Sequence, residues 1–151
     1  MKPQPAGCNC TALRKASRRI TQLYDAALAQ SGLKITQRAI LAQIRRSEPS
    51  TVGSLAAALV MDAGALAHTL KPLDRDGLIS IAVDPQDRRN RLITLTAAGH
   101  ASLAASDASW DQAQRAFEGA FGKAGAKALR ESMRLLASDE FVDEFARRMR
   151  A

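Results

Sequence analysis

Apolar residues recur at helical spacing along the first half of the chain. Between residues 10 and 32 they return every three or four positions, which predicts one amphipathic helix that Gly32 ends. Three shorter helices are predicted before Gly77, each preceded by a residue type that favours helix starts. The predicted N-caps of these helices are Thr36, Thr51 and Asp62. The first half of the chain is therefore expected to be mainly helical.

After Gly77 the period of the pattern changes from about 3.6 residues to 2. Two short strands are predicted, at 78–83 and 91–96. The polar segment 84–90 between them has the composition of a hairpin tip. This part of the chain is therefore expected to form a two-stranded ribbon.

Helical spacing returns after Thr96, which is suited to cap the next helix. The large apolar residues of that helix stand seven positions apart, at Leu103, Trp110 and Phe117. A last helical stretch is expected from about 125 to 149, with a break at Ser138 and Asp139. The chain is thus predicted to end as it begins, in amphipathic helices.

These elements indicate a mainly α (α+β) fold: a winged helix-turn-helix domain with a two-stranded wing, flanked by terminal helices. The terminal helices have too few partners inside one small domain, and exposing their Leu and Phe side chains costs several kcal/mol at about 25 cal/mol per Å². We therefore expect a homodimer. The predicted segments are a flexible N-terminus at 1–9, dimerisation helices at 10–32 and 97–151, and the winged helix-turn-helix domain at 33–96.

Composition narrows the class of protein. The 151 residues are 46% hydrophobic and 25% charged, which is ordinary for a globular protein, and aromatic residues make up 4%. No apolar run approaches the roughly 20 residues that cross a bilayer, and the N-terminus lacks the apolar stretch of a signal peptide. The expected location is the cytoplasm, with no membrane partner.

The positive charge is concentrated near the N-terminus. The chain has 22 Lys and Arg against 15 Asp and Glu, a net charge of +7. Residues 1–50 hold nine basic and two acidic side chains, so the whole excess lies in that third of the chain. A basic excess fits a polyanionic partner such as a nucleic acid, and it equally fits a protein that is merely basic.

Three motifs stand out along the chain. They are DPQDRRNR at 84–91 followed by LTAAG at 95–99, the stretch from Met61-Asp62 to LKPLDRDGLI at 70–79, and LKITQ at 33–37. Together they resemble the MarR family of bacterial multiple-antibiotic-resistance regulators. The first and strongest is similar to the family's wing and strand exit, the second to its recognition helix and the Leu-x-x-x-Gly-Leu-Ile that follows, and the third to the entry to its second helix. The resemblance covers about residues 10–150. It implies a homodimeric repressor that binds double-stranded DNA and is released by a phenolic or carboxylate ligand or by oxidation.

The wing carries the most specific of these motifs. Arg88, Arg89 and Arg91 lie at or beside the predicted tip, where a long cation can enter a narrow minor groove. Asp87, two residues before Arg89, is placed to hold its guanidinium in one orientation. The alternative interpretation is a solvated, charged turn.

The helix after Asp62 is expected to enter the major groove. Small residues stand where the family commonly has Arg, Ser or Thr, so direct contacts with bases should be few. These residues are Ala63, Gly64, Ala65 and Ala67. The remaining polar side chains are His68, Thr69 and Lys71. We expect specificity to depend on the wing and on DNA shape, with weak or altered DNA binding as the alternative.

Two further features concern the predicted recognition helix and the starts of the helices near it. Pro72 lies inside the predicted recognition helix, and because the family pattern has a proline there, a kink is expected rather than a helix end. Residues near helix starts are expected to face the sugar-phosphate backbone, with ordinary capping as an equal alternative. They are Lys34, Thr36, Gln37, Arg38, Thr51 and Ser54.

The two cysteines, Cys8 and Cys10, are too few for a disulfide scaffold. A helix N-terminus with Arg14 nearby favours a thiolate, which permits peroxide sensing or a disulfide between subunits. The alternative is a pair of uninvolved thiols. His68 and His100 stand alone and fit no ligand spacing, so no metal site and no cofactor is expected.

An effector pocket is expected where the dimerisation helices meet the winged domain, because aromatic acids need apolar walls and one or two cations. The candidate residues are Arg14, Arg18, Tyr24 and Trp110. The plainer interpretation is that Arg18 is solvated and Trp110 belongs to the core.

No enzyme is expected, since the chain has no phosphate-binding glycine loop, nucleophile elbow or HExxH motif. Three hypotheses therefore stand. The first is a ligand-responsive repressor, the second is a repressor that senses oxidation through Cys8 and Cys10, and the third is a winged-helix module that binds protein and not DNA.

Overall fold

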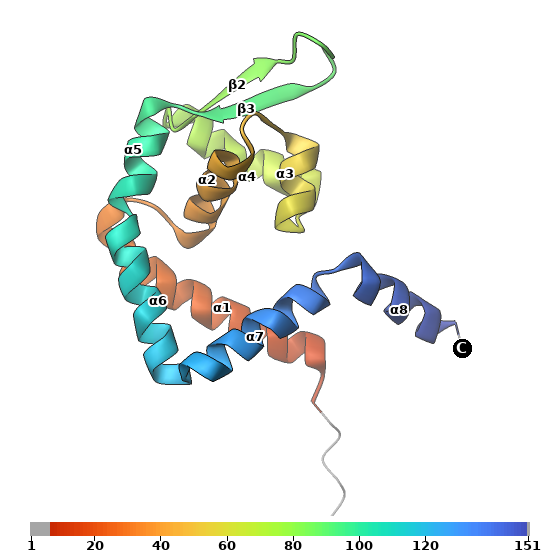
Figure 1. The fold of residues 1–151 in the computed structure, drawn as a ribbon. Helices are drawn as coiled ribbons and strands as arrows, with labels where there is room; N and C mark the ends of the chain where they lie inside the picture. The colour runs from red at the N-terminus through yellow and green to blue at the C-terminus, as the bar shows by residue number, and fades with distance from the viewer. Residues whose placement is uncertain (1–6, 151) are drawn as a thin grey trace, which may run out of the picture. The chain divides into compact units, whose positions relative to one another are not determined.

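The computed structural model describes residues 7–150 (Figure 1). The chain forms two compact units, Met1–Trp110 and Asp111–Ala151. Residues 1–6, most of the segment predicted to be a flexible N-terminus, lie outside the described residues. The first helix begins at Asn9, one residue before the predicted start.

The first unit begins with helices, as the apolar spacing predicts. They are α1 (Asn9–Ala27), the 3-10 turn η1 (Ala29–Ser31), α2 (Ile35–Ser47), α3 (Val52–Leu59) and α4 (Ala63–Arg75). Gly32 has a φ of 75° and Gly77 a φ of 71°, the left-handed conformation in which glycine ends a helix without strain. Helix α4 continues through Pro72 to Arg75, so the expectation that this proline does not end the helix is confirmed.

Two of the three caps predicted before Gly77 are confirmed. Thr51 Oγ1 accepts the Ser54 N–H at 3.1 Å, and Asp62 Oδ1 accepts the Ala65 N–H at 3.0 Å. The third, Thr36, is wrong, because α2 begins two residues earlier with Lys34 as its N-cap. Asp25, ten residues back in the chain, accepts the Ile35 N–H at 2.7 Å. The first backbone N–H of α2 is therefore satisfied by the Asp25 carboxylate, whereas a cap by the nearby Thr36 hydroxyl is expected from the sequence.

The sheet has one more strand than predicted. Strands β2 (Ile79–Val83) and β3 (Arg91–Leu95) form the expected antiparallel hairpin, with Ile81 opposite Ile93. Strand β1 (Ser50–Thr51) adds to the other edge of β3, giving the order β1-β3-β2. Two residues are too few for an alternating pattern, so this pairing is visible only in three dimensions.

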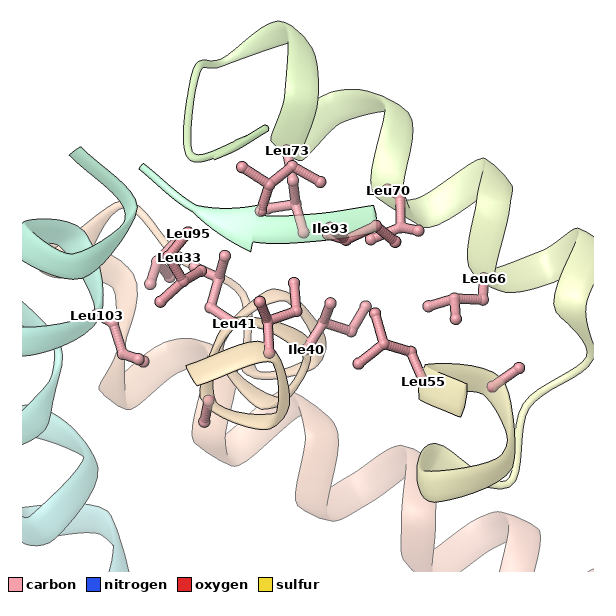
Figure 2. Close-up of a cluster of buried hydrophobic side chains, with 14 residues drawn as sticks. Leu33, Ile40, Leu41, Leu55, Leu66, Leu70, Leu73, Ile93, Leu95 and Leu103 are labelled. Atoms are coloured by element: carbon pink, nitrogen blue, oxygen red, sulfur yellow. The ribbon is translucent and has the colours of Figure 1, made fainter. Parts of the chain in front are cut away.

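One apolar core joins α2, α3, α4 and β3. Leucine and isoleucine side chains from these elements point toward one another in Figure 2, and Leu103 and Leu33 close one end of the cluster. Several of them are entirely inaccessible to solvent: Leu41, Ile44, Leu55, Leu66, Leu73, Ile93 and Leu103. The core fixes α4 and the base of the β2–β3 hairpin against the same set of side chains, and the hairpin extends beyond them (Figure 1).

The chain after the sheet is broken more often than predicted. One helix was expected from Thr96 through Phe117, but α5 (Ala97–Ala105) and α6 (Asp107–Phe121) are separate elements that meet at Ser106. Gly122, with a φ of 85°, separates α6 from α7 (Lys123–Leu136). The predicted break at Ser138 is confirmed, because its Oγ accepts the Phe141 N–H at 3.2 Å and caps α8 (Asp139–Met149).

Helices α1 and α8 have no buried residue in the single chain. Large apolar side chains on α1, α6, α7 and α8 are exposed, among them Leu13, Leu23, Phe121, Leu135, Val142, Phe145 and Met149. Within residues 7–150 no single helix is long and apolar enough to cross a membrane. The pair α3 and α4, bent by 108°, meets that test only when both are taken together, by length and composition alone.

Candidate nucleic-acid interface

The tip of the β2–β3 hairpin is held by its own aspartates. Asp84 Oδ1 accepts the Gln86 N–H at 2.8 Å, and Asp87 Oδ1 accepts the Arg89 N–H at 3.1 Å. The second carboxylate oxygen of Asp87 accepts a hydrogen bond from Asn90 Nδ2 at 3.3 Å. Each aspartate thus closes an Asx turn, which fixes the backbone of an otherwise polar loop.

The three wing arginines fall into two groups. Arg91 Nη1 donates to the carbonyl oxygens of Arg88 and Asn90, at 3.2 and 3.3 Å. These two hydrogen bonds hold the backbone of the tip in place. The guanidinium groups of Arg88 and Arg89 are exposed and make no hydrogen bond or ion pair with any residue from 7 to 150. The expected hold of Asp87 on the Arg89 guanidinium is wrong: the carboxylate binds the Arg89 backbone instead.

Helix α4 presents a small-residue surface at its start. Ala63, Gly64 and Ala65 are exposed, and a Cβ added at Gly64 would stand 3.1 Å from the capping Asp62 Oδ1. His68 and Lys71 are exposed on the next turns. Thr69 is half-buried, and its hydroxyl donates to the Ala65 carbonyl oxygen at 3.0 Å, so that hydroxyl is left only as an acceptor.

The residues at helix starts are mostly engaged in capping. Thr51 and Ser54 cap each other, since Ser54 Oγ accepts the Thr51 N–H at 3.0 Å in return for the bond already described. Gln37 Oε1 accepts the Lys34 N–H at 3.0 Å. Thr36 and Ser54 are exposed, and Thr51 and Gln37 are half-buried. The capping interpretation describes these side chains in the single chain.

Arg38 is placed differently from the expectation. Its side chain is only 8% exposed, Nε donates to Ser106 Oγ at 3.0 Å, and Nη2 donates to Asp107 Oδ1 at 2.6 Å. The guanidinium carbon lies 4.4 Å from the centre of the Trp110 ring. Arg38 therefore does not present its side chain at the surface as expected, because it is buried and its Nε and Nη2 donate inside the protein. Its position three residues before buried Leu41 could have signalled this burial.

Of the four candidate effector residues, all in the first unit, only Arg14 and Arg18 lie together. Two shallow hollows on the surface are lined only by residues of α1, one by Leu13, Arg14, Ser17 and Arg18, the other by Lys15, Ala16, Arg18, Arg19 and Gln22. Tyr24 is half-buried and lines neither hollow, and Trp110 stacks on Arg38. One helix cannot enclose a ligand, so in the single chain these four residues do not form a pocket.

The cysteines lie at the start of α1. Cys8 is the N-cap residue, and both thiols are free and exposed. The Thr11 hydroxyl and the backbone N–H groups of the first turn lower the pKa of the Cys8 thiol from its ordinary value. Arg14, the expected cause, is not among the groups responsible. No cluster of three or more His, Cys, Asp or Glu side chains able to hold a metal is found within residues 7–150.

The core, the capped α3–α4 pair and the projecting hairpin define a winged helix-turn-helix protein. The MarR family model matches residues 33–90. A structure of the Mycobacterium tuberculosis transcriptional regulator MosR in complex with DNA is 33% identical, with a TM-score of 0.79, and the similarity covers 87% of this chain and 94% of that one. The chain belongs to the MarR family of transcriptional regulators.

Two curated relatives are similar over shorter segments. The Staphylococcus haemolyticus regulator SarZ is 29% identical over 90 residues, which is 60% of this chain and 61% of SarZ. The Rhodopseudomonas palustris transcriptional activatory protein BadR is 33% identical over 76 residues, 48% of this chain and 43% of BadR. The matched segments thus span less than two thirds of either relative. Of the two, BadR is named as an activator.

Proposed function

We propose that this protein is a homodimeric DNA-binding transcriptional repressor of the MarR type, acting in the cytoplasm on a pseudo-palindromic operator. The observation that carries the proposal is the wing. The guanidinium groups of Arg88 and Arg89 pair with no residue from 7 to 150, and they stand on a tip whose backbone is held by Asp84, Asp87 and Arg91. A cation presented on a rigid, exposed hairpin suits a narrow minor groove. The DNA complex of the similar MosR supports duplex DNA as the partner.

The salt dependence of DNA binding tests this proposal. A duplex enriched from a random-sequence pool by the wild-type protein serves as the probe. The Arg89→Ala variant should bind it severalfold more weakly, and the slope of log affinity against log salt should fall by about 0.9 for each lost phosphate contact. Arg134→Ala on α7, an exposed arginine with the same charge, is the control. A wild-type protein that shows no salt slope would instead favour the module that binds protein.

The homodimer is proposed from the exposed apolar side chains of the terminal helices. Leu23 on α1 is 57% exposed and Phe145 on α8 is 58% exposed in the single chain. Covering several such side chains with a second copy recovers roughly several kcal/mol at about 25 cal/mol per Å². Segments 10–32 and 97–151 are accordingly proposed as dimerisation helices, and 33–96 as the DNA-binding domain. Two recognition helices would then lie about 34 Å apart, one turn of the duplex.

Release by a small phenolic or carboxylic acid is part of the proposal. Arg14 and Arg18 are exposed cations beside apolar Leu13 on α1, a combination that suits an aromatic carboxylate once a second surface covers it. A panel of such acids should contain one that raises the melting temperature, because a ligand bound only by the folded protein stabilises it by mass action. The Arg18→Ala variant should lose that rise in melting temperature. Arg115→Ala, which removes an exposed arginine from α6, is the control and should keep it.

A second candidate, release by oxidation, is favoured by the lowered pKa of Cys8 and by the exposure of Cys10 two residues later. In that step peroxide oxidises two thiols to one disulfide, their protons and the peroxide oxygens leaving as two waters. Peroxide should then release DNA from the wild type but from neither Cys8→Ser nor Cys10→Ser. If peroxide released DNA equally from the wild type and both variants, the cysteines would not be the sensor, and release by a small molecule would remain as the proposal.

A further inference from the structure

Helices α5 and α6 meet at Ser106 without a loop. The Ser106 N–H donates to the carbonyl oxygens of Ser102 and Leu103, and its own carbonyl accepts the Trp110 N–H at 3.0 Å. Backbone hydrogen bonding therefore continues from one helix into the next. The Ser106 hydroxyl also donates to the Leu103 carbonyl oxygen at 2.6 Å, a side-chain bond of the kind that bends helices. Because such a bond can bend a helix, an additional contact is needed to restrain the conformation of the junction.

Arg38 supplies that restraint from α2, 68 residues earlier in the chain. Its guanidinium reaches both residues of the junction, Ser106 and Asp107, and lies over the ring of Trp110 one turn further on. We call Arg38, Ser106, Asp107 and Trp110 the Arg38 cluster. All four belong to the first unit, and Ser106, Asp107 and Trp110 lie within residues 106–110, where α6 begins.

The chemistry of the Arg38 cluster requires an arginine. The hydrogen bond from Nε to Ser106 and the ion pair from Nη2 to Asp107 fix the guanidinium within its plane, and the Trp110 ring restrains its face. A lysine ammonium has no such plane and cannot satisfy these three directions at once. Because the arginine is 8% exposed, moving the junction away from it would leave a buried cation without partners, which is strongly unfavourable.

Arg38 also connects this junction to the DNA-reading elements. Helix α2, which carries it, contributes Ile40, Leu41 and Ile44 to the core that holds α4 and β3. A shift of the junction is therefore a shift relative to the whole winged helix-turn-helix core. In a homodimer such a shift changes the separation of the two recognition helices, although neither helix changes its own structure.

We infer that Arg38 is a positioning residue for DNA binding: it sets the orientation of the α5–α6 junction relative to the winged core and makes no contact with DNA. The inference rests on the proposed function, because orientation matters to affinity only when two domains engage two half-sites together. Arg38 then controls how well the dimer matches the spacing of the half-sites.

Spacing discrimination tests the inference directly. The probes are a two-half-site duplex enriched by the wild-type protein and versions with one or two base pairs added or removed between the half-sites. Arg38→Met, which retains an apolar stem, should bind the parent duplex about tenfold more weakly and should discriminate less between spacings. Its salt slope should equal that of the wild type, because no phosphate contact is lost. Circular dichroism melts establish that each variant is folded at the assay temperature.

Two further variants complete the design. Arg45→Met removes the same charge from an exposed position on α2 and should keep the full spacing discrimination. Asp107→Ala removes the carboxylate that pairs with Arg38. Because the Asp107 side chain is 46% exposed, the variant should still fold, and like Arg38→Met it should discriminate less between spacings. The double variant Arg38→Met/Asp107→Ala should be no weaker than Arg38→Met, since the two side chains act together.

The outcomes separate the inference from the proposed function. A salt slope that falls by about 0.9 in Arg38→Met would mean that this arginine binds a phosphate, and the inference would be wrong. Full spacing discrimination in a folded Asp107→Ala protein would also overturn it. A wild-type protein that ignores spacing altogether would refute the homodimeric two-half-site function itself, and the inference would fail with it.

Discussion

At the scale of single residues, Gly99 shows why one position of the LTAAG motif accepts no side chain. A Cβ at Gly99 would stand 2.0 Å from the carbonyl oxygen of Leu78, which is backbone and cannot move aside. That same oxygen accepts the Thr96 N–H at 3.1 Å, and the Thr96 hydroxyl donates to the Gly77 carbonyl oxygen. The start of α5 is thus joined closely to the turn that ends α4.

Replacing Gly99 by alanine should therefore destabilise the protein by about 3 kcal/mol, at the upper end of what overpacking costs. Thermal or urea unfolding measures the change. Gly119→Ala in α6 is the matched control, because nothing lies within 4 Å of its added Cβ. Alanine there should be neutral or stabilise by about 1 kcal/mol, since it favours helix over glycine. Equal effects at both positions would show that the approach to Leu78 is not restrictive.

Cys8 gives a second prediction at this scale, about pH. Its thiol pKa is lowered chiefly by the Thr11 hydroxyl, so the thiolate should persist to lower pH than in an ordinary cysteine. In a Cys10→Ser background, the rate of alkylation by iodoacetamide should fall only as the pH drops through this lowered pKa. The additional change Thr11→Val should move that midpoint to higher pH. Superimposable pH profiles would contradict the prediction.

At the scale of elements, the wing is a hairpin whose tip is ordered by side-chain bonds to its own backbone. Asp84 and Asp87 accept backbone N–H groups, and Arg91 donates to two carbonyl oxygens. An acidic residue beside a phosphate-rich partner is electrostatically unfavourable. Its presence at position 87 is explained by the shape it imposes on the tip from which Arg88 and Arg89 project.

Asp87→Ala should therefore weaken DNA binding by up to about thirtyfold, as expected when two hydrogen bonds of roughly 1 kcal/mol each are lost. Electrostatics alone predicts the opposite sign, because the change removes a negative charge from a DNA-facing surface. Asp74→Ala, an exposed aspartate on α4, removes the same charge and should leave affinity unchanged or slightly higher. Filter binding of both variants at one salt concentration distinguishes the two effects. Tighter binding by Asp87→Ala would show that the carboxylate does not order the tip.

At the scale of the whole molecule, exposed apolar side chains on the terminal helices are the feature that a single chain leaves unexplained. They include Leu13 and Leu23 on α1 and Val142, Phe145 and Met149 on α8. Exposed apolar side chains that gather on one helix commonly mark a surface for a partner. A second copy of the same chain is the partner that the proposed function supplies.

Phe145→Glu should accordingly convert a dimer into single chains at micromolar concentration, because it places a charge in the proposed interface. Sedimentation velocity measures the state. Val83→Glu on β2, at another exposed apolar position, is the control and should remain dimeric. The DNA affinity of Phe145→Glu should also fall, since two linked half-site contacts become one. A wild-type protein that sediments as a single chain would refute the homodimer.

The sequence by itself determined the elements whose signals are local. The helical period, the caps Thr51 and Asp62, the glycine ends and the alternating hairpin all follow from neighbours within a few residues, so the winged helix-turn-helix class could be predicted. What only the tertiary structure decided involves partners far apart in the chain. Asp25 displaces the predicted Thr36 cap, β1 pairs with β3, and Arg38 turns inward to Ser106 and Asp107. A buried charge or an unpaired backbone N–H takes whichever partner the fold brings near, and one-dimensional spacing does not encode that proximity.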